Sequence, residues 1–196
     1  MKRFRKLLCM MISLALLTGC TPSVSILEIQ KPEADLTEKT LYSDTIYYVV
    51  AEVPENWEEK GDFLVPPSTG SSSEAIIFVF NWNTPAIEEI YQEQVDLLFQ
   101  HDYEAFEDVF NNLYSGDGVL QKIQAYRYEE QEIFEVQYLD TEQDENIILY
   151  RKDIPYCIMI TEATDESVIE AARWAAVTMS KKMIPPSFEP AESFYR

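Results

Sequence analysis

The sequence has little cysteine, histidine and glycine. Its 196 residues include three cysteines, five glycines and a single histidine, His101. A zinc site would therefore lack nitrogen ligands beyond His101, and a Ser-His-Asp triad would depend on that one residue. The sequence also contains no GxSxG, GxGxxG or GxxxxGK[ST] motif. Zinc catalysis, hydrolysis at a nucleophile elbow and nucleotide binding are thus poor hypotheses.

Positive charge is scarce as well. The chain has 15 Lys and Arg against 35 Asp and Glu, and its formal charge is −20. Four of the cations lie in the first six residues, and without them the charge becomes −24. Nucleic acids and anionic head groups are bound through Lys and Arg, so this composition argues against both as ligands. A cationic partner or a divalent cation held by carboxylates stays open, and solubility is the preferred explanation.

The first 20 residues have the pattern of an export signal. Residues 7–17 form an apolar run of 11 residues, which is shorter than the roughly 20 that span a bilayer. The segment Leu17-Thr18-Gly19-Cys20 resembles the lipobox of bacterial lipoproteins. The resemblance implies that residues 1–19 are a signal peptide and that diacylglyceryl is attached to the Cys20 thiol, with two acyl chains as a stable membrane anchor. The alternative is a secreted protein cut just after Cys20.

Cysteine usage then predicts how the mature protein is stabilised. Cys9 leaves with the leader and Cys20 is acylated, so that Cys157 has no partner for a disulfide. One domain with a hydrophobic core is expected. Cys157 lies in the apolar stretch YCIMIT and is predicted to be a core residue, whereas His101 lies in the polar stretch LFQHDYE and is predicted to cap a helix or face solvent.

Composition divides the chain into four segments. After the signal peptide, residues 20–40 are polar, contain Pro22 and Pro32, and predict a lipidated, flexible tether. Residues 41–184 are predicted to form one domain. Residues 185–196 form a C-terminal tail rich in proline and aromatic side chains.

Strands are predicted at residues 45–53 and 75–82 and then in four successive segments between 119 and 163. These four segments are separated by short polar turns, so we expect an antiparallel meander. In the second of them Phe134, Val136 and Tyr138 alternate with Glu135 and Gln137. This alternation predicts a sheet with one covered face.

Three helices complete the pattern. The first begins after Thr84 at Pro85, and the second carries apolar residues at helical spacing from Phe106 to Leu113. The last begins near Glu166 and is predicted to extend through residues 181–182, because lysines suit a final turn, and to end before residues 185–186.

This order of elements predicts an α+β fold, an antiparallel sheet with helices packed on its faces. It resembles the Mog1/PsbP-like family over residues 42–184. The similarity rests on VPENW at 53–57, on the hairpins AYRYEEQEIFEVQY and ENIILYRKDIPYCIMI, and on the last helix. The resemblance implies a non-enzymatic accessory role, because members of that family bind other proteins or serve as extrinsic subunits of membrane complexes, some with bound metal.

Aromatic residues supply the candidates for a partner-binding surface. Aromatic side chains anchor interfaces, although they also fill cores, and core packing is preferred for Trp57, Trp82 and Trp174. The candidates lie around the first two helices and in the tail: Trp82, Tyr91, Tyr103, Phe188, Phe194 and Tyr195.

The alternating carboxylates from Asp140 to Asn146 resemble the start of a calcium loop. Position 6 of that loop is Glu145 in place of glycine, and position 12 is Arg151 in place of glutamate. A solvated hairpin turn is therefore preferred to a metal site.

Together these observations predict a lipid-anchored protein on the extracytoplasmic face of a cell membrane. We expect a non-catalytic binding or accessory protein with an unidentified protein partner and no cofactor. The alternative is a carboxylate-dependent hydrolase or a cation-binding envelope protein, since chance pairing of carboxylates is easy among 35 acids.

Overall fold

The structure is a computed structural model. It describes six segments of the chain: residues 24–43, 46–60, 63–67, 76–81, 85–113 and 118–184. Within them, no helix is long and apolar enough to cross a membrane.

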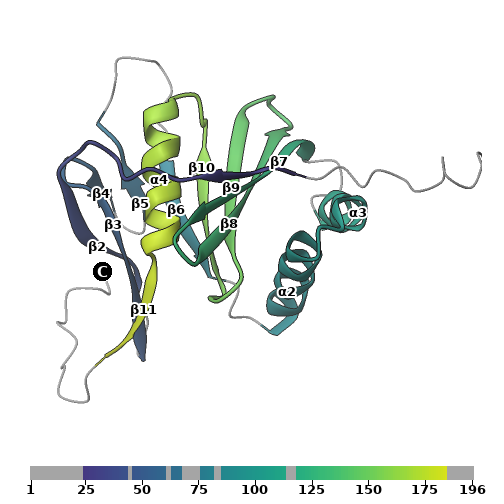
Figure 1. Cartoon of the computed structure of the whole chain (residues 1–196), viewed down its shortest axis with the longest axis horizontal. Coiled ribbons are helices and arrows are strands. Elements are labelled where there is room, and N and C mark those ends of the chain that lie inside the picture. Colours follow the sequence, from purple (N-terminus) through teal and green to yellow (C-terminus); the bar gives the residue numbers. More distant parts are fainter. Residues whose placement is uncertain are drawn as a thin grey trace, which may run out of the picture.

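The described elements stack as alternating sheets and helices (Figure 1). A three-stranded sheet, helix α4 (Glu166–Thr178), an eight-stranded sheet and the pair α2 (Pro85–Phe99) and α3 (Tyr103–Leu113) follow one another across the molecule. The large sheet has the spatial order β1 (Ile26–Glu28), β7 (Gly118–Tyr128), β8 (Gln131–Asp140), β9 (Glu145–Arg151), β10 (Tyr156–Thr161), β6 (Ile76–Asn81), β5 (Phe63–Val65) and β4 (Glu58–Lys60). The small sheet has the order β11 (Ser180–Met183), β3 (Tyr47–Pro54) and β2 (Leu36–Ser43).

The predicted meander is confirmed, since β7, β8, β9 and β10 are consecutive antiparallel neighbours. Residues 75–82 also contain the expected strand, β6, which pairs with β10 in the interior of the sheet. β1 is the exception to the antiparallel pattern, because it pairs in parallel with β7. Two sheets covered by helices place the chain in the α+β class, as expected.

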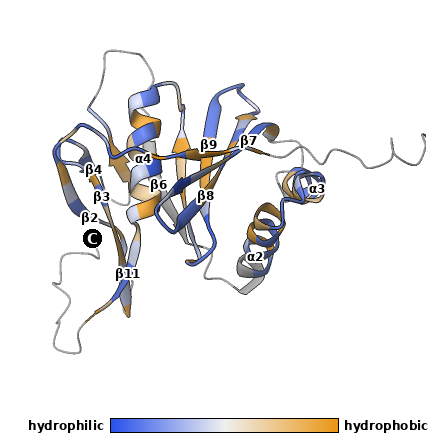
Figure 2. Cartoon of the chain, in the orientation of Figure 1, coloured by the Kyte–Doolittle hydropathy of each residue, from blue (hydrophilic) through white to orange (hydrophobic). Residues whose placement is uncertain are grey.

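Each face of the large sheet has its own hydrophobic core. Against α4 pack Ile133, Leu149 and Ile158, and the same core continues into the small sheet. Against α2 and α3 pack Phe134, Val136 and Tyr150 with the helical phenylalanines. Figure 2 shows the hydrophobic residues concentrated on the strands between the helices. Helix α4 lies between two sheets, so it is buried on nearly all sides, as nine of its residues show.

The prediction that the sheet has one covered face was wrong. Phe134 and Val136 face the α2–α3 side, and Glu135 between them is fully buried on the α4 side. Its carboxylate accepts hydrogen bonds from Arg173 of α4 at 2.6 and 3.1 Å. A charged residue in an alternating strand therefore marks a buried ion pair here, and not a solvated face.

The prediction of a flexible tether up to residue 40 also requires correction. Residues 26–28 form β1 on the edge of the large sheet, and residues 36–43 form β2, which pairs with β3. Ile29 and Leu41 enter the core on the α4 side. These segments lack a clear period and become strands because β7 and β3 supply the hydrogen-bond partners along their edges.

Helix α4 ends earlier than predicted. It begins at Glu166 after the N-cap Asp165, whose carboxylate accepts from the Ser167 N–H at 2.9 Å, and it ends at Thr178. The guanidinium of Arg151 terminates it by donating to the carbonyl oxygens of residues 176, 177 and 179 at 3.0, 3.3 and 2.6 Å. The lysines expected in the last turn lie on β11, which pairs with β3.

Candidate functional site

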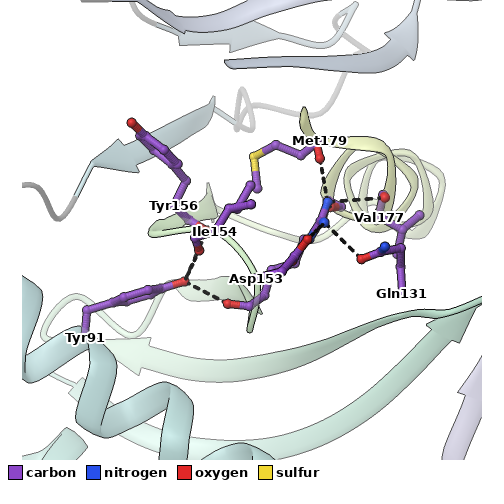
Figure 3. Close-up of polar contacts among 9 residues, drawn as sticks. Tyr91, Gln131, Asp153, Ile154, Tyr156, Val177 and Met179 are labelled. Atoms are coloured by element: carbon purple, nitrogen blue, oxygen red, sulfur yellow. Dashed lines mark hydrogen bonds and ion pairs between the residues drawn. The ribbon is translucent and has the colours of Figure 1, made fainter. Parts of the chain in front are cut away.

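Tyr91 belongs to the core, so its assignment to a partner-binding surface was wrong. The side chain is 2% exposed and points from α2 toward the turn after β9 (Figure 3). Its hydroxyl lies 3.2 Å from the carbonyl oxygens of Arg151 and Tyr156 and 3.3 Å from that of Ile154. Burial raises the pKa of Tyr91 well above its usual value. The residue therefore fastens α2 to the end of the sheet.

The same turn is held from the opposite face by the side chain of Arg151. Its guanidinium donates to Gln131 Oε1 at 2.9 Å and to the carbonyls at the end of α4, and it forms an ion pair with Asp153 (Figure 3). Since Tyr91 holds the backbone and Arg151 holds the helix end, residues 151–156 connect the two cores. These polar groups are engaged in structural contacts.

The connection between α2 and α3 is a sharp turn built around His101. The Gln100 N–H donates to the Asp96 carbonyl at 2.9 Å, and His101 has a φ of 60°, in the left-handed region that a non-glycine residue rarely adopts. Asp102 Oδ1 then accepts from the Ala105 N–H at 3.2 Å and caps α3. His101 is exposed to solvent, as one of the two predicted alternatives stated.

This turn brings together an aromatic cluster that we call the junction surface: Phe99, His101 and Tyr103, with Lys152 beside them. The imidazole Nδ1 of His101 lies 2.7 Å from the Tyr103 hydroxyl, and their rings are 5.9 Å apart. The ammonium of Lys152 lies 5.6 Å from the Phe99 ring centroid. The buried ring of Phe134 supports the cluster from below, 4.9 Å from Phe99.

The junction surface is accessible while its shape is held by the core. Phe99 and Tyr103 are half-buried, and His101 is exposed. Partial burial raises the pKa of the Tyr103 hydroxyl, and the negative charge of Glu132 raises it further. Of the predicted partner-binding residues, Tyr103 alone among those described lies at such a surface. The alternation of Phe99, His101 and Tyr103 in the sequence is the signal that would have identified it.

Acidic side chains surround the junction surface on both helices. They extend along the outer sides of α2 and α3, and those that are exposed are Glu89, Glu93, Asp102, Glu104, Glu107 and Asp108. Lys152 is the exposed cation of the junction surface itself. The surface therefore combines aromatic rings, which suit a protein interface, with a negative potential that attracts cationic groups.

The acidic turn between β8 and β9 is organised by the carboxylate of Asp140. It accepts from the backbone N–H groups of Glu142 and Asp144 at 2.9 and 3.0 Å and from Asn146 Nδ2 at 3.1 Å. The hydrogen bond from Asp144 and those from its neighbours lower the pKa of Asp140. Among the described residues, no three His, Cys, Asp or Glu side chains are grouped to hold a metal ion.

Cys157 is fully buried in the core on the α2–α3 side, as predicted. On that side Tyr150 donates to Gln94 Oε1 at 3.0 Å. The predicted core positions of Trp57 and Trp174 are also confirmed, at 4% and 3% exposure. The sequence reading missed the charged pair Glu135 and Arg173, although an arginine within the apolar stretch VIEAARWAAV was a signal for it.

The other predicted site residues lie outside the described segments. They are the lipidation residue Cys20 and the aromatic candidates Trp82, Phe188, Phe194 and Tyr195.

Comparisons with known proteins add a similarity in structure. A scan against models of protein families finds no match, and a search of curated proteins finds no similar sequence. Among solved structures, the chain is similar to the cyanobacterial PsbP (CyanoP) of Synechocystis sp. PCC 6803, with a TM-score of 0.36 and 16% identity. The match covers 84% of this chain and 98% of the cyanobacterial one. At this TM-score and identity the similarity carries no conclusion about activity, ligand or partner.

Proposed function

We propose that this protein is a lipid-anchored, extracytoplasmic binding protein that uses the junction surface to bind a protein partner. The lipobox-like segment Leu17-Thr18-Gly19-Cys20 at the end of a short apolar run supports the anchor. Two acyl chains on Cys20 hold a protein at a bilayer far more stably than one chain does. The domain then acts at the outer face of that membrane.

The observation that carries the binding role is the aromatic cluster of the junction surface. Phe99 and Tyr103 are only half-buried although they rest on the buried ring of Phe134. Rigid aromatic rings at a surface bind with little loss of side-chain entropy, which is why they dominate interface energetics. The surrounding carboxylates favour a partner with Lys or Arg at its contact surface.

The proposal is non-catalytic, and the positions of the two most reactive side chains support it. The thiol of Cys157 is fully buried in an apolar core, where a thiolate is unfavourable. The Nδ1 of His101 lies 2.7 Å from the Tyr103 hydroxyl, and the raised pKa of that hydroxyl disfavours the tyrosinate that would act as a nucleophile. A carboxylate-dependent hydrolase or a cation-binding envelope protein stays the alternative, with no observation among the described residues in its favour.

The anchor is tested by replacing Cys20 with serine. The parent protein should incorporate labelled fatty acid and enter the detergent phase on Triton X-114 partitioning, and Cys20→Ser should lose both properties. Equal partitioning of the two proteins would show that the lipoprotein interpretation is wrong.

The binding role is tested with a photocrosslinking phenylalanine analogue placed at Tyr103 in cells. The matched control is Tyr48, a half-buried tyrosine on β3 of the small sheet. We expect a defined product at Tyr103 but not at Tyr48, and less of it when Glu104 and Glu107 are replaced by lysine. Equal crosslinking at both positions, or no effect of the charge reversal, would contradict the proposed surface.

A further inference from the structure

We infer that the edge of the large sheet formed by β1 and β7 faces the bilayer. The inference rests on the proposed anchor at Cys20 and asks how the domain is oriented by it. We call the exposed side of β1 and β7 the membrane edge, defined by Ile26, Leu27, Val119 and Lys122.

The length of chain between the anchor and the fold sets the orientation. Val24 already packs against the core on the α2–α3 side, so three residues separate it from Cys20. Four residue intervals reach at most about 14 Å when fully extended. Val24, two residues before β1, therefore cannot lie farther than this from the lipidated residue.

The start of β1 is firmly attached to the domain. The carbonyl of Ser25 accepts a hydrogen bond from Gln124 Nε2, and Ile26 is in register with Ala125 of β7. The Ile29 N–H donates to the Arg127 carbonyl at 2.8 Å. The lipidated residue is thus connected by a short segment to the edge of a continuous sheet. Because this edge is hydrogen-bonded to the rest of the sheet, its position close to the anchor sets the orientation of the whole domain.

The side chains of this edge suit a bilayer surface. Among the described residues, the exposed large hydrophobic side chains are Ile26, Leu27, Ile46, Phe63, Val119 and Met183, and half of them belong to β1 and β7. Leu27 is 43% exposed and Val119 is 56% exposed. Lys122 on β7 and Lys31 just after β1 are exposed cations, and Glu28 is an exposed acid among them.

The opposite edge of the same sheet provides a matched control position. Phe63 on β5 is 45% exposed, close to the 43% of Leu27. Six strand intervals separate β1 from β5, which corresponds to roughly 30 Å at the usual spacing of strands. If the short connection orients the domain, Phe63 lies well away from the bilayer.

The test uses the full mature, lipidated protein in vesicles of phosphatidylethanolamine and phosphatidylglycerol. Leu27→Cys and, separately, Phe63→Cys are labelled with a fluorophore, because Cys20 is acylated and Cys157 is buried. We expect nitroxide lipids to quench the label at residue 27 several-fold more than the label at residue 63. Ile26→Cys is a second position on the edge, in case labelling of residue 27 disturbs β1.

Insertion of a spacer distinguishes the inferred orientation of the domain from the proposed lipid anchor. A flexible Gly-Ser insertion of about 20 residues after Thr21 lets the domain move over tens of Å, so quenching at residue 27 should fall to the level at residue 63. Flotation with the vesicles should stay unchanged. Equal quenching at both positions in protein that floats, or full quenching at residue 27 with the spacer, would overturn the orientation and leave the anchor intact. Loss of flotation in the parent would overturn both.

Discussion

The two faces of the large sheet bury their polar groups in different ways. On the α4 face, Glu135 is a fully buried carboxylate that receives two hydrogen bonds from Arg173, whose side chain is 10% exposed. On the α2–α3 face, the buried pair Tyr150 and Gln94 is a contact between neutral groups. The first face buries matched charges, and the second buries tyrosine hydroxyl groups within an aromatic core.

This difference shows where mutations should be most costly. A buried ion pair contributes little net stability, but removal of one partner leaves an uncompensated charge in a medium of low polarity. Removal of a neutral hydroxyl leaves an unsatisfied acceptor, and the cost is smaller. The α4 face should therefore be the more sensitive to single substitutions of polar residues.

Arg173→Met should have the largest effect, about 3–5 kcal/mol of unfolding free energy, because Glu135 is left buried and unpaired. Urea unfolding measures it. The double variant with Glu135→Gln should recover most of the loss. Glu132→Gln, which breaks the more exposed pair of Arg127 and Glu132, should cost much less than Arg173→Met, because solvent screens the exposed charges. If the substitutions in the buried and exposed pairs lowered the unfolding free energy equally, the proposed sensitivity of the α4 face would be wrong.

Tyr91→Phe should cost about 1–3 kcal/mol, because it removes the hydroxyl that donates to the carbonyls of the turn after β9. The aromatic ring stays in place, so the core packing is preserved. Tyr103→Phe is the control. The Tyr103 hydroxyl is partly exposed, so its removal should cost only a few tenths of the stability that Tyr91→Phe costs. Thermal unfolding of both variants at neutral pH measures the difference. If Tyr91→Phe lowered the stability as much as Arg173→Met does, buried neutral groups would contribute as much to stability as buried charges.

Cys157→Ala should cost about 1–2 kcal/mol, because the thiol fills space in the core on the α2–α3 side. Partner binding should stay intact, because a fully buried thiol cannot contact a partner. Urea unfolding measures the stability, and crosslinking through residue 103 measures the binding. Loss of a function in Cys157→Ala with unchanged stability would favour the enzymatic alternative.

The acidic turn between β8 and β9 lies outside both cores, and its effect should be smaller and dependent on pH. The pKa of Asp140 is lowered in the folded protein, so its contribution to stability is present above the unfolded pKa and is lost as the pH falls through the folded value. Asp140→Asn should flatten the acid limb of the plot of stability against pH. An unchanged acid limb would contradict this role.

Calcium should have the smallest effect of all. If the turn is a solvated loop, calcium and sodium should change the melting temperature equally at matched ionic strength, because screening does not depend on coordination. A saturable calcium shift that Asp140→Asn together with Asp144→Asn abolishes would show a bound cation instead.

The sequence predicted the elements whose pattern is local. The apolar spacing from Phe106 to Leu113 predicted α3, and the alternation of Phe134 and Val136 predicted strand β8. It assigned Tyr91 to the wrong environment, because the sequence alone does not distinguish a tyrosine on the solvent side of a helix from one on the side that packs against a strand. The junction surface was predicted only through Tyr103, since Phe99 and Lys152 come together from different elements.

What the sequence determined by itself is the order of the four meander strands and of the three helices, and the scarcity of reactive side chains, because these follow from local spacing and composition. Only the tertiary structure decided which charges are buried. Glu135 and Arg173 are 38 residues apart, and their pairing is decided only when the sheet and α4 face each other. It also decided that residues 26–28 and 36–43 are strands and that α4 ends at Thr178. In each case the partner is distant in sequence, so that hydrogen bonds formed on folding outweigh the local preference.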